Sequence, residues 1–560
     1  MNKTTKITNN WHRITLVVAL CLFGFCLMWA MTAPRTKKKK QNTDERVYLV
    51  HADELLYGDY SDRIGAQKLR GKVHFTHLGS QLWCDSAYFY QEANNVEAFG
   101  HVRYTQGDTL SLTANYADYM GFDQIMHARN NVWLKHRTQT LNTDSLNYDR
   151  IYDYAYFFGG GKLYDGDDRL VADWGQYSPA TRDAVFYYNV KMHSGSNVVT
   201  TDTLHYNTRT SVAHVTGPSV IVSKGTIIHT TDAYTNSHTD QSQLFGRSTI
   251  IDKSKTITGD SLYHDNATGD NNGYGNVVYV DSINKNELHA NRLFYNDKTG
   301  YGYATKRALM IDYSQNDTLW MHSDSMKIYT FHINTDSVYR KVHAFNHVKA
   351  YRVDMQSICD SLVFNSQDSC MTMYRDPIAW NGNRQILGEV IKVYFNDSTI
   401  RHAEVIGQAL SVERADSLRH FNQVSARQFT AFFIDGNMRR TDAIGNVKSL
   451  YYNADGNDSV LTELNYLETD TLRMFVSPQR QLEKIWASKS VGVMYPITQI
   501  PPDKYRLPEF AWFDDLRPTD KNDIFEWRGK SAGTELKVVK RREAPLQTFG
   551  SSAAPSAVNP

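Results

Sequence analysis

Apolar residues alternate with polar ones in a short phrase that returns along the chain. The phrase reads Thr-Asp-Ser-Leu-Asn-Tyr at Thr143–Tyr148, Thr-Asp-Thr-Leu-His-Tyr at Thr201–Tyr206 and Gly-Asp-Ser-Leu-Tyr-His at Gly259–His264. A small or apolar residue stands two positions after the acidic residue, and an aromatic usually stands four positions after it. Successive side chains leave a strand on opposite faces, so this period of two predicts a β-strand with one buried face.

The acidic or amide residue of the phrase, here called the anchor, recurs down the chain. We place the anchors at Asp53, Asp85, Asn115, Asp144, Asp173, Asp202, Asp232, Asp260, Asn291, Asp324, Asp360, Glu389, Gln428 and Asp470. From Asp85 to Asn291 the spacing is close to about 30 residues, within the range of repeat architectures. One repeat cannot bury its apolar stripe alone, whereas stacked repeats share a continuous interior.

A second phrase of the form Ala/Gly-x-x-x-Val follows many anchors, for example at Ala98–Val102 and Gly273–Val277. Segments rich in Asn and Gly, such as Asn266–Gly269 and Asn296–Gly300, stand between the two phrases and suit tight turns. We therefore predict an all-β fold. It is an elongated repeat array, a β-jelly-roll or solenoid of stacked strand pairs, that follows an N-terminal hydrophobic segment.

The N-terminus predicts export or anchoring. Residues Ile14–Met31 form an uncharged apolar run preceded by Lys3, Lys6 and Arg13, typical of a signal peptide or of a membrane anchor. The predicted organisation is a signal or anchor at 1–34, a basic linker at 35–46, the repeat array at 47–500 and a C-terminal extension at 501–560, disordered toward its end. The basic linker opposes export under the positive-inside rule, and the strand-rich body favours an envelope protein.

Composition narrows the function classes. The formal net charge is +1 and no basic run lies within the repeats, so nucleic acid is not an expected partner. Of the five cysteines, Cys21 and Cys26 lie in the apolar run, and Cys84, Cys359 and Cys370 are too sparse for a disulfide framework or a zinc site.

No reactive constellation is evident in the sequence. It contains no His-Glu-x-x-His motif, no Gly-x-Ser-x-Gly elbow and no phosphate-binding glycine loop, so we expect no enzyme activity, no metal and no cofactor. The anchors are interpreted as residues that form hydrogen bonds at turn corners rather than as calcium ligands. The candidate residues for either a packed core or a lipid groove are Leu146, Tyr148, Leu204, Tyr206, Leu262, Leu293 and Tyr295, and the pattern alone leaves both roles open.

The repeated Asp-Ser/Thr-Leu-x-Tyr strand, the Gly-x-Val strand and the N-terminal segment resemble the OstA-like proteins of Bacteroidetes-type bacteria. These are relatives of the OstA/LptA β-jelly-roll family of lipopolysaccharide transport. The C-terminal run Asp470-Thr-Leu-Arg-Met-Phe, Tyr495-Pro-Ile, Leu507-Pro-Glu-Phe-Ala-Trp and Arg517-Pro is also similar to that group. The resemblance spans about residues 47 to 527.

This resemblance implies a periplasmic protein of the Gram-negative envelope that acts in outer-membrane assembly. It implies that lipopolysaccharide binds in an apolar β groove and is conveyed toward the outer membrane, with inner- and outer-membrane transport proteins as partners and membrane contact through the N-terminal segment. The alternative is a β-helix surface or scaffold protein, or a polysaccharide-acting enzyme. An enzyme of that kind would place Arg or Lys beside Asp144, Asp173 and Asp202, and no such column is present.

Overall fold

The computed structural model describes residues 45–58, 63–315, 317–333, 335–396, 399–416, 419–454, 460–479 and 482–528. The predicted N-terminal segment (1–34), all but the end of the basic linker, and the end of the C-terminal tail lie outside these residues. Within the described ranges, no helix has the length and apolar character needed to cross a membrane. The chain divides into two compact units, residues 1–108 with 116–125 and residues 109–115 with 126–560.

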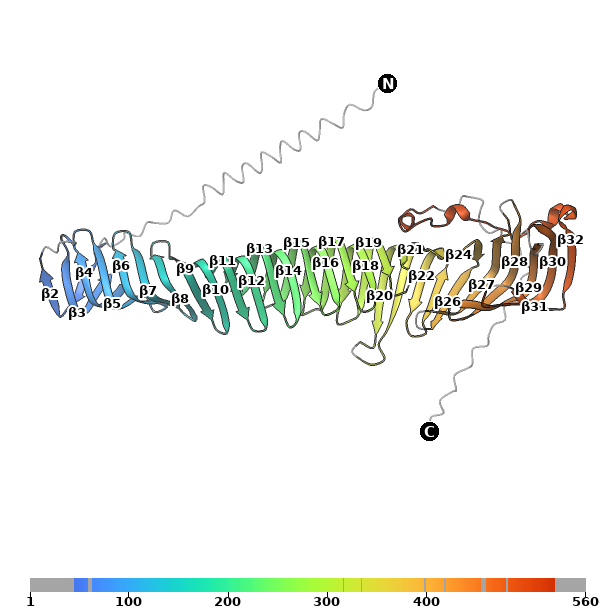
Figure 1. The fold of residues 1–560 in the computed structure, drawn as a ribbon. Coiled ribbons are helices and arrows are strands. Elements are labelled where there is room, and N and C mark those ends of the chain that lie inside the picture. The colour runs from blue at the N-terminus through green and yellow to red at the C-terminus, as the bar shows by residue number, and fades with distance from the viewer. Residues whose placement is uncertain are drawn as a thin grey trace, which may run out of the picture. The chain divides into compact units, whose positions relative to one another are not determined.

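Nearly all of the described chain is antiparallel strand (Figure 1). The first part contains β1 (Tyr48–His51), β2 (Glu54–Tyr57), β3 (Gln67–His77), β4 (Ser80–Tyr90), β5 (Asn95–Gln106), β6 (Leu110–Met120), which both units share, and β7 (Ile125–His136). Next come β8 (Gln139–Asp149), β9 (Tyr154–Asp165), β10 (Asp168–Ser178), β11 (Asp183–Ser194), β12 (Asn197–Asn207), β13 (Val212–Ser223), β14 (Thr226–Asn236), β15 (Gln241–Asp252), β16 (Lys255–Asp265), β17 (Asp270–Asp281), β18 (Asn286–Asn296) and β19 (Tyr301–Asp312).

The remaining strands are less regular in length. They are β20 (Leu319–Phe331), β21 (Tyr339–Arg352), β22 (Met355–Asn365), β23 (Cys370–Tyr374), β24 (Ile378–Asn381), β25 (Arg384–Leu387), β26 (Val390–Asn396), β27 (Thr399–Arg414), β28 (Phe421–Ile434), β29 (Asn437–Ala454), β30 (Leu461–Val476), β31 (Leu482–Ser488) and β32 (Val491–Pro496). Four 3₁₀ turns follow, η1 (Ile497–Gln499), η2 (Pro502–Lys504), η3 (Asp514–Leu516) and η4 (Asp523–Phe525). The prediction of an all-β repeat array is confirmed.

Each long strand is interrupted by a β-bulge at one level. Between β11 and β12, pairing runs to Tyr187 opposite Thr203 and resumes at Val190 opposite Thr201. Two residues, Tyr188 and Asn189, therefore face one, and both adopt positive φ. A bulge of this kind bends the strand and lets its two halves take different directions. The same interruption recurs from β12 to β22, so each strand has two arms joined at a corner.

The anchors stand at these corners, as the single residue opposite each bulge. Asp202 faces Gly217, and Asp260 faces Gly275, where an added Cβ would lie 2.5 Å from the carboxylate. Other anchors bind side chains of bulge residues: Asp85 binds His101 at 2.7 Å and Asp173 binds Asn189 at 2.6 Å. The equivalence predicted for Asp144, Asp173 and Asp202 is confirmed, because all three occupy the unpaired corner position.

Two anchors were placed one residue too late. The unpaired corner residue of β14 is Thr231, not Asp232, because Asp232 pairs with Thr216 on β13 and with Phe245 on β15. In β28 the corner residue is Arg427, and Gln428 pairs with Ile406. Both errors arose because we chose the acidic or amide residue by type. The corner residue is defined by its position in the pairing register, and a threonine or an arginine can also occupy that position.

The two arms of a strand fold over one another and enclose the apolar face. In unit 1 the rings of Phe75 and Phe89 lie 5.4 Å apart, although they occupy opposite arms of the β3–β4 hairpin. In unit 2 the Nδ1 atom of His136 lies 2.8 Å from the Tyr177 hydroxyl, again between opposite arms. This covering explains why Leu146, Tyr148 and Leu204 are at most 1% exposed.

The hairpin turns follow the predicted chemistry. Gly269 and Gly300 end the two predicted turns and have φ of 80° and 65°. The Asn296 side-chain oxygen accepts hydrogen bonds from the amides of Lys298 and Thr299, as in an Asx turn. Successive turns are also joined, because the amide of Asp297 donates to the Gly269 carbonyl.

A C-terminal strap, residues 497–528, returns across the outer face of the later strands (Figure 1). Its residues Phe513 and Leu516 pack with Trp380 and other apolar side chains of β22–β28 in one cluster. Buried glutamines bind its backbone: Gln385 Oε1 accepts from the Phe513 amide at 2.8 Å and its Nε2 donates to the Ala511 carbonyl at 2.9 Å.

The same arrangement repeats along the strap. Gln423 binds the Leu507 amide and the Tyr505 carbonyl, and Gln356 accepts from the Arg517 guanidinium at 2.7 Å. At the far end the buried Lys349 ammonium donates to the Asp523 and Glu526 carbonyls. Burial lowers the pKa of Lys349, and the nearby Asp523 carboxylate opposes that shift. The strap is therefore held by side chains from β21, β22, β25 and β28.

Leu204→Asp tests the burial of the phrase. Leu204 is 0% exposed, so the substitution buries a charge and loses apolar contacts. We expect it to reduce the free energy of unfolding by about 3 kcal/mol or more. Thr200→Asp, at an exposed position of the same strand, is the matched control and should be near neutral. Chemical denaturation measures both, and equal midpoints for the two variants would contradict the register.

Gln385→Leu tests the strap. The change leaves the Phe513 amide and the Ala511 carbonyl without their partner, at a cost of about 1–3 kcal/mol for each unsatisfied group. We expect faster proteolytic cleavage within residues 497–528, read by mass spectrometry. Gln367→Leu, on an exposed turn, is the control. Identical cleavage rates in the two variants would show that the glutamine does not hold the strap.

Candidate functional site

The inner face of unit 2 is half-exposed along one row of side chains. This row, here called the isoleucine row, crosses seven strands from β13 to β19 and consists of Ile221, Ile228, Ile250, Ile257, Tyr279, Leu288 and Met310. At the level of this row, the neighbouring strands carry buried residues: Met192 and Val199 on one side, Met321 on the other. Six strand spacings correspond to roughly 29 Å. The row is therefore a bounded stretch of partly accessible apolar surface.

The opposite arm carries polar side chains over the same strands. This polar row consists of Thr235, Ser242, His264 and Asn271, which are register neighbours from β14 to β17 and are all half-buried. The ring of His264 bonds the Asn271 side-chain oxygen at 2.7 Å. Asn271 in turn donates to the Asp297 carboxylate at 2.9 Å. Over these strands the inner face is therefore amphipathic, with an aliphatic arm and a polar arm.

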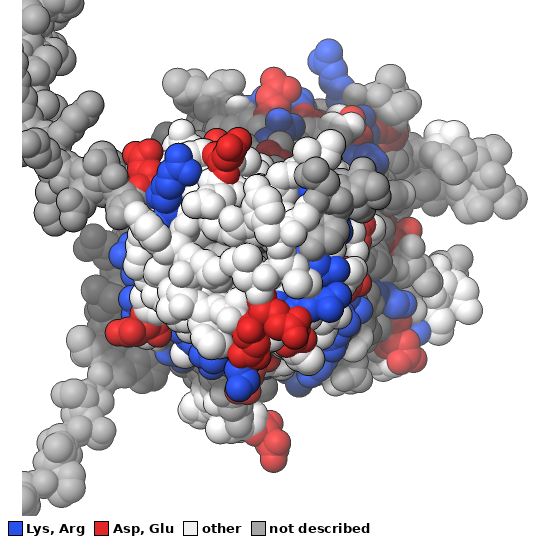
Figure 2. All heavy atoms as spheres, turned by 90° about the vertical axis from the view of Figure 1, so that its left-hand side faces the viewer, with Lys and Arg blue, Asp and Glu red and all other residues white. Residues whose placement is uncertain are grey.

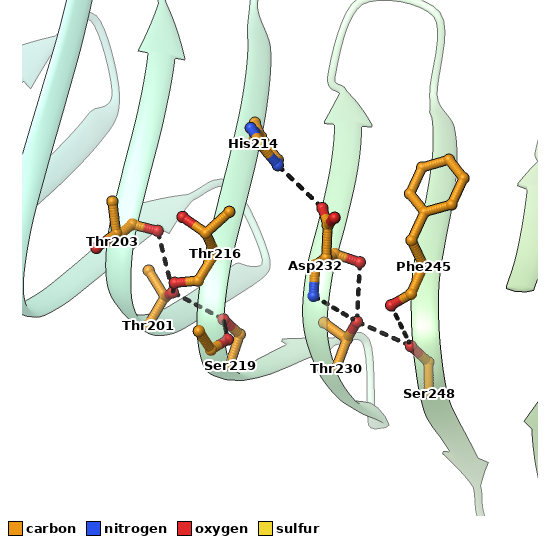
Figure 3. A network of polar contacts seen from close by, with 10 residues as sticks. Thr201, Thr203, His214, Thr216, Ser219, Thr230, Asp232, Phe245 and Ser248 are labelled. Carbon is orange, nitrogen blue, oxygen red and sulfur yellow. Dashed lines mark hydrogen bonds and ion pairs between the residues drawn. The ribbon is translucent and has the colours of Figure 1, made fainter. Parts of the chain in front are cut away.

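Buried hydroxyl pairs line the inner side of the corner between the two arms (Figure 3). The hydroxyls of Thr201 and Ser219 lie 2.7 Å apart, and those of Thr230 and Ser248 lie 2.9 Å apart. Each pair also bonds backbone carbonyls freed by the bulge, such as that of Gly217. These hydroxyls satisfy the backbone of the corner and so are structural.

The aromatic positions of the phrase align across the sheet in a column, and the inner face becomes more exposed where this column ends. Tyr148, Tyr177 and Tyr206 fill the column in β8–β12 and are at most 6% exposed. Burial raises the pKa of Tyr206 to about 12, which keeps its hydroxyl neutral. From β14 the register places Thr235 and then Ser242 in the same column. These shorter side chains fill less of the space between the arms.

The structure places most of the candidate residues in the core. Leu146, Tyr148, Leu204, Tyr206, Leu262 and Leu293 are at most 7% exposed, and Tyr295 is half-buried beside the polar row. Whether any of them contacts a lipid stays a prediction. Sequence reasoning missed the isoleucine row. On β14, β16 and β18 the row lies three positions before the corner residue, and on β13, β15, β17 and β19 it follows the bulge. The signal was present, because Ile228 and Ile257 continue the alternation upstream of Thr231 and Asp260.

The described cysteines Cys84, Cys359 and Cys370 are buried and form no disulfide bond. Burial raises the pKa of the Cys84 and Cys359 thiols to about 12. Within the ranges that the structure describes, no group of three or more His, Cys, Asp or Glu side chains is arranged to hold a metal ion.

Comparison with known proteins bears on the first part of the chain. Residues 44–202 match the family model described as OstA-like protein. The chain carries an OstA-like region. This confirms the predicted resemblance to the OstA-like family, and the match covers β1 to β11 and most of β12, ahead of the isoleucine row.

No curated protein matches the chain. Among solved structures, LptH from Pseudomonas aeruginosa, titled the LptA homologous periplasmic component of the lipopolysaccharide transport device, matches at 15% identity. That match covers 22% of this chain and 82% of LptH, with a TM-score of 0.18. A score of this size carries no argument about fold or function.

Introduced cysteines test the accessibility of the inner face. Ile250→Cys places a thiol on the isoleucine row, and Leu244→Cys places one at a 3% exposed position of the same strand. We expect a small maleimide to label the Ile250→Cys variant at least about tenfold faster than the Leu244→Cys variant. The reagent reacts with a thiolate, which must form and be accessible to it. The unsubstituted chain gives the background from the native cysteines. Equal labelling rates would show that the row is as closed as the core.

Proposed function

We propose that the chain is a non-enzymatic envelope protein that binds lipopolysaccharide or a related lipid on its inner face and conveys it toward the outer membrane. The observation that carries this proposal is the isoleucine row, a half-exposed apolar strip across seven strands. The OstA-like match of residues 44–202 supports it, because the resemblance to the OstA-like proteins implies a role in lipopolysaccharide transport.

An acyl chain suits the isoleucine row on energetic grounds. Burial of a methylene contributes roughly 0.8 kcal/mol and depends little on register, so a chain can advance along the row without losing its binding energy. The polar row on the opposite arm offers hydroxyl, imidazole and amide groups to the oxygen-rich part of the same lipid. The site thus fits an amphipathic ligand better than a simple hydrocarbon.

The proposed setting is the periplasm, with the segment 1–34 as a signal or membrane anchor and other transport proteins of the envelope as partners. In unit 1 the strands β1 and β2 form an exposed edge with Val50, Leu55 and Tyr57 at least 52% exposed. Figure 2 shows that uncharged residues cover most of this end, with acidic and basic residues around its rim. A strand edge with exposed apolar side chains and few charges can accept a strand from a partner.

Photo-crosslinking in living cells tests the proposal. We expect a photoreactive residue at Ile228 or Ile257 to capture lipopolysaccharide. The matched control is Ile227, the preceding residue, which is 37% exposed but points to the outer face of the same strand. Capture at Ile228 without capture at Ile227 is the expected result. Equal capture at both, capture of protein alone, or unchanged outer-membrane lipopolysaccharide after depletion would contradict the proposal and favour a scaffold role.

A further inference from the structure

The bulge between β23 and β24 consists of Arg375, Asp376 and Pro377. Tyr374 pairs with Ser361 and Ile378 pairs with Ile358, so the three residues 375–377 face the two residues 359–360. On the other side the same three face the two residues 388–389, because Tyr374 also pairs with Val390 and Ile378 with Leu387. The excess is one residue, as at other corners: between β16 and β17 the three residues 275–277 likewise face the two residues 259–260. Arg375 and Asp376 both adopt positive φ, as the bulge residues Tyr188 and Asn189 do.

A cavity of about 620 Å³ lies at this corner. It is within the size range of small-molecule sites, roughly 300–1,000 Å³. Its lining includes the aromatic rings of Phe345 and Tyr374 and the charged side chains of Asp360, Arg375 and Glu389. It lies on the outer side of the sheet, because Leu362 and Met373, which follow and precede the lining residues Ser361 and Tyr374, are buried inside.

The floor of the cavity is a hollow between two rings. Phe345 pairs with Ser361 and Ser361 pairs with Tyr374, so the small serine stands between the aromatic side chains on three adjacent strands. The two ring-bearing positions are therefore about 10 Å apart. Tyr374 is 40% exposed. The Lys327 ammonium lies 5.3 Å from the Phe345 ring centroid.

The rim carries both acceptors and a donor. The Arg375 guanidinium pairs with the Asp360 carboxylate at 3.1 Å, and the Ser361 hydroxyl donates to the same carboxylate at 3.3 Å. Glu389 is the corner residue of the next repeat. An added Cβ on Gly407 would lie 2.4 Å from its Oε2, so the positive-φ glycine leaves room for this carboxylate.

We propose that this cavity binds a saccharide unit. Sugar rings present polarised C–H groups, which pack on the negative faces of aromatic rings, and hydroxyls, which donate to carboxylates and accept from a guanidinium. The cavity offers both kinds of group side by side. The carboxylates of Asp360, Asp376 and Glu389 would repel an anion. A simple cation would gain nothing from the guanidinium. The site is separate from the isoleucine row and does not rest on the proposed lipid function.

Saturation-transfer NMR on the full chain tests this site with two lipid-free probes. One is the oligosaccharide released from lipopolysaccharide by mild acid, and the other is the tetramer of N-acetylglucosamine. We expect transfer to at least one probe, and which probe responds identifies the source of the glycan. Because neither probe carries acyl chains, failure of the lipid proposal leaves this result unaffected. Transfer to neither probe would overturn the saccharide site.

Two variants locate the binding. Tyr374→Ala should weaken the binding of the responsive probe about tenfold, the upper range for loss of one aromatic contact. Tyr274→Ala removes a 43% exposed ring from the same register position at the corner of β17, away from the cavity, and should leave binding unchanged. Melting temperatures of both variants confirm folding. Unchanged binding in Tyr374→Ala, or equal loss in both variants, would overturn the proposed location.

Discussion

The structure depends on a single constraint: each strand must bury one apolar face, and no second sheet of different sequence covers it. Each strand buries that face by bending at a bulge, so that its own two arms cover one another. The bend requires residues with positive φ on one strand, such as Gly275, and the corner residue opposite, such as Asp260, lies against them. Everything else in the repeat follows from this corner: the anchor spacing, the buried hydroxyl pairs and the enclosed leucine column.

The same constraint explains how function can vary along a uniform scaffold. The corner fixes the backbone, and the residues on the arms decide whether the interior is closed. Aromatic residues such as Tyr206 close it in the earlier strands, and Thr235 and Ser242 leave it half-exposed further on. At the corner after β23, the side chains of Phe345, Tyr374 and Arg375 line a cavity. Local changes thus create distinct sites without altering the repeat.

The repeat was predictable because period and residue type coincide in the phrase, as at Asp202, Leu204 and Tyr206. The hydrogen-bonded turns at Gly269 and Gly300 followed from turn chemistry. The isoleucine row was not predicted, since the pattern was followed only downstream of each anchor. The strap contacts could not be predicted, because the Gln385 side chain meets Phe513 across more than a hundred residues. The boundary between the two units falls inside the repeat, where the period changes little.

The claim that the inner face between β13 and β19 receives acyl chains is tested most directly by an experimental structure of the protein purified together with its envelope lipid. The account predicts continuous hydrocarbon density along Ile221, Ile250 and Ile257, with the oxygen-rich part of the lipid beside His264 and Asn271. Density for lipid only on the outer face, or an empty inner face in a lipid-saturated sample, would contradict it.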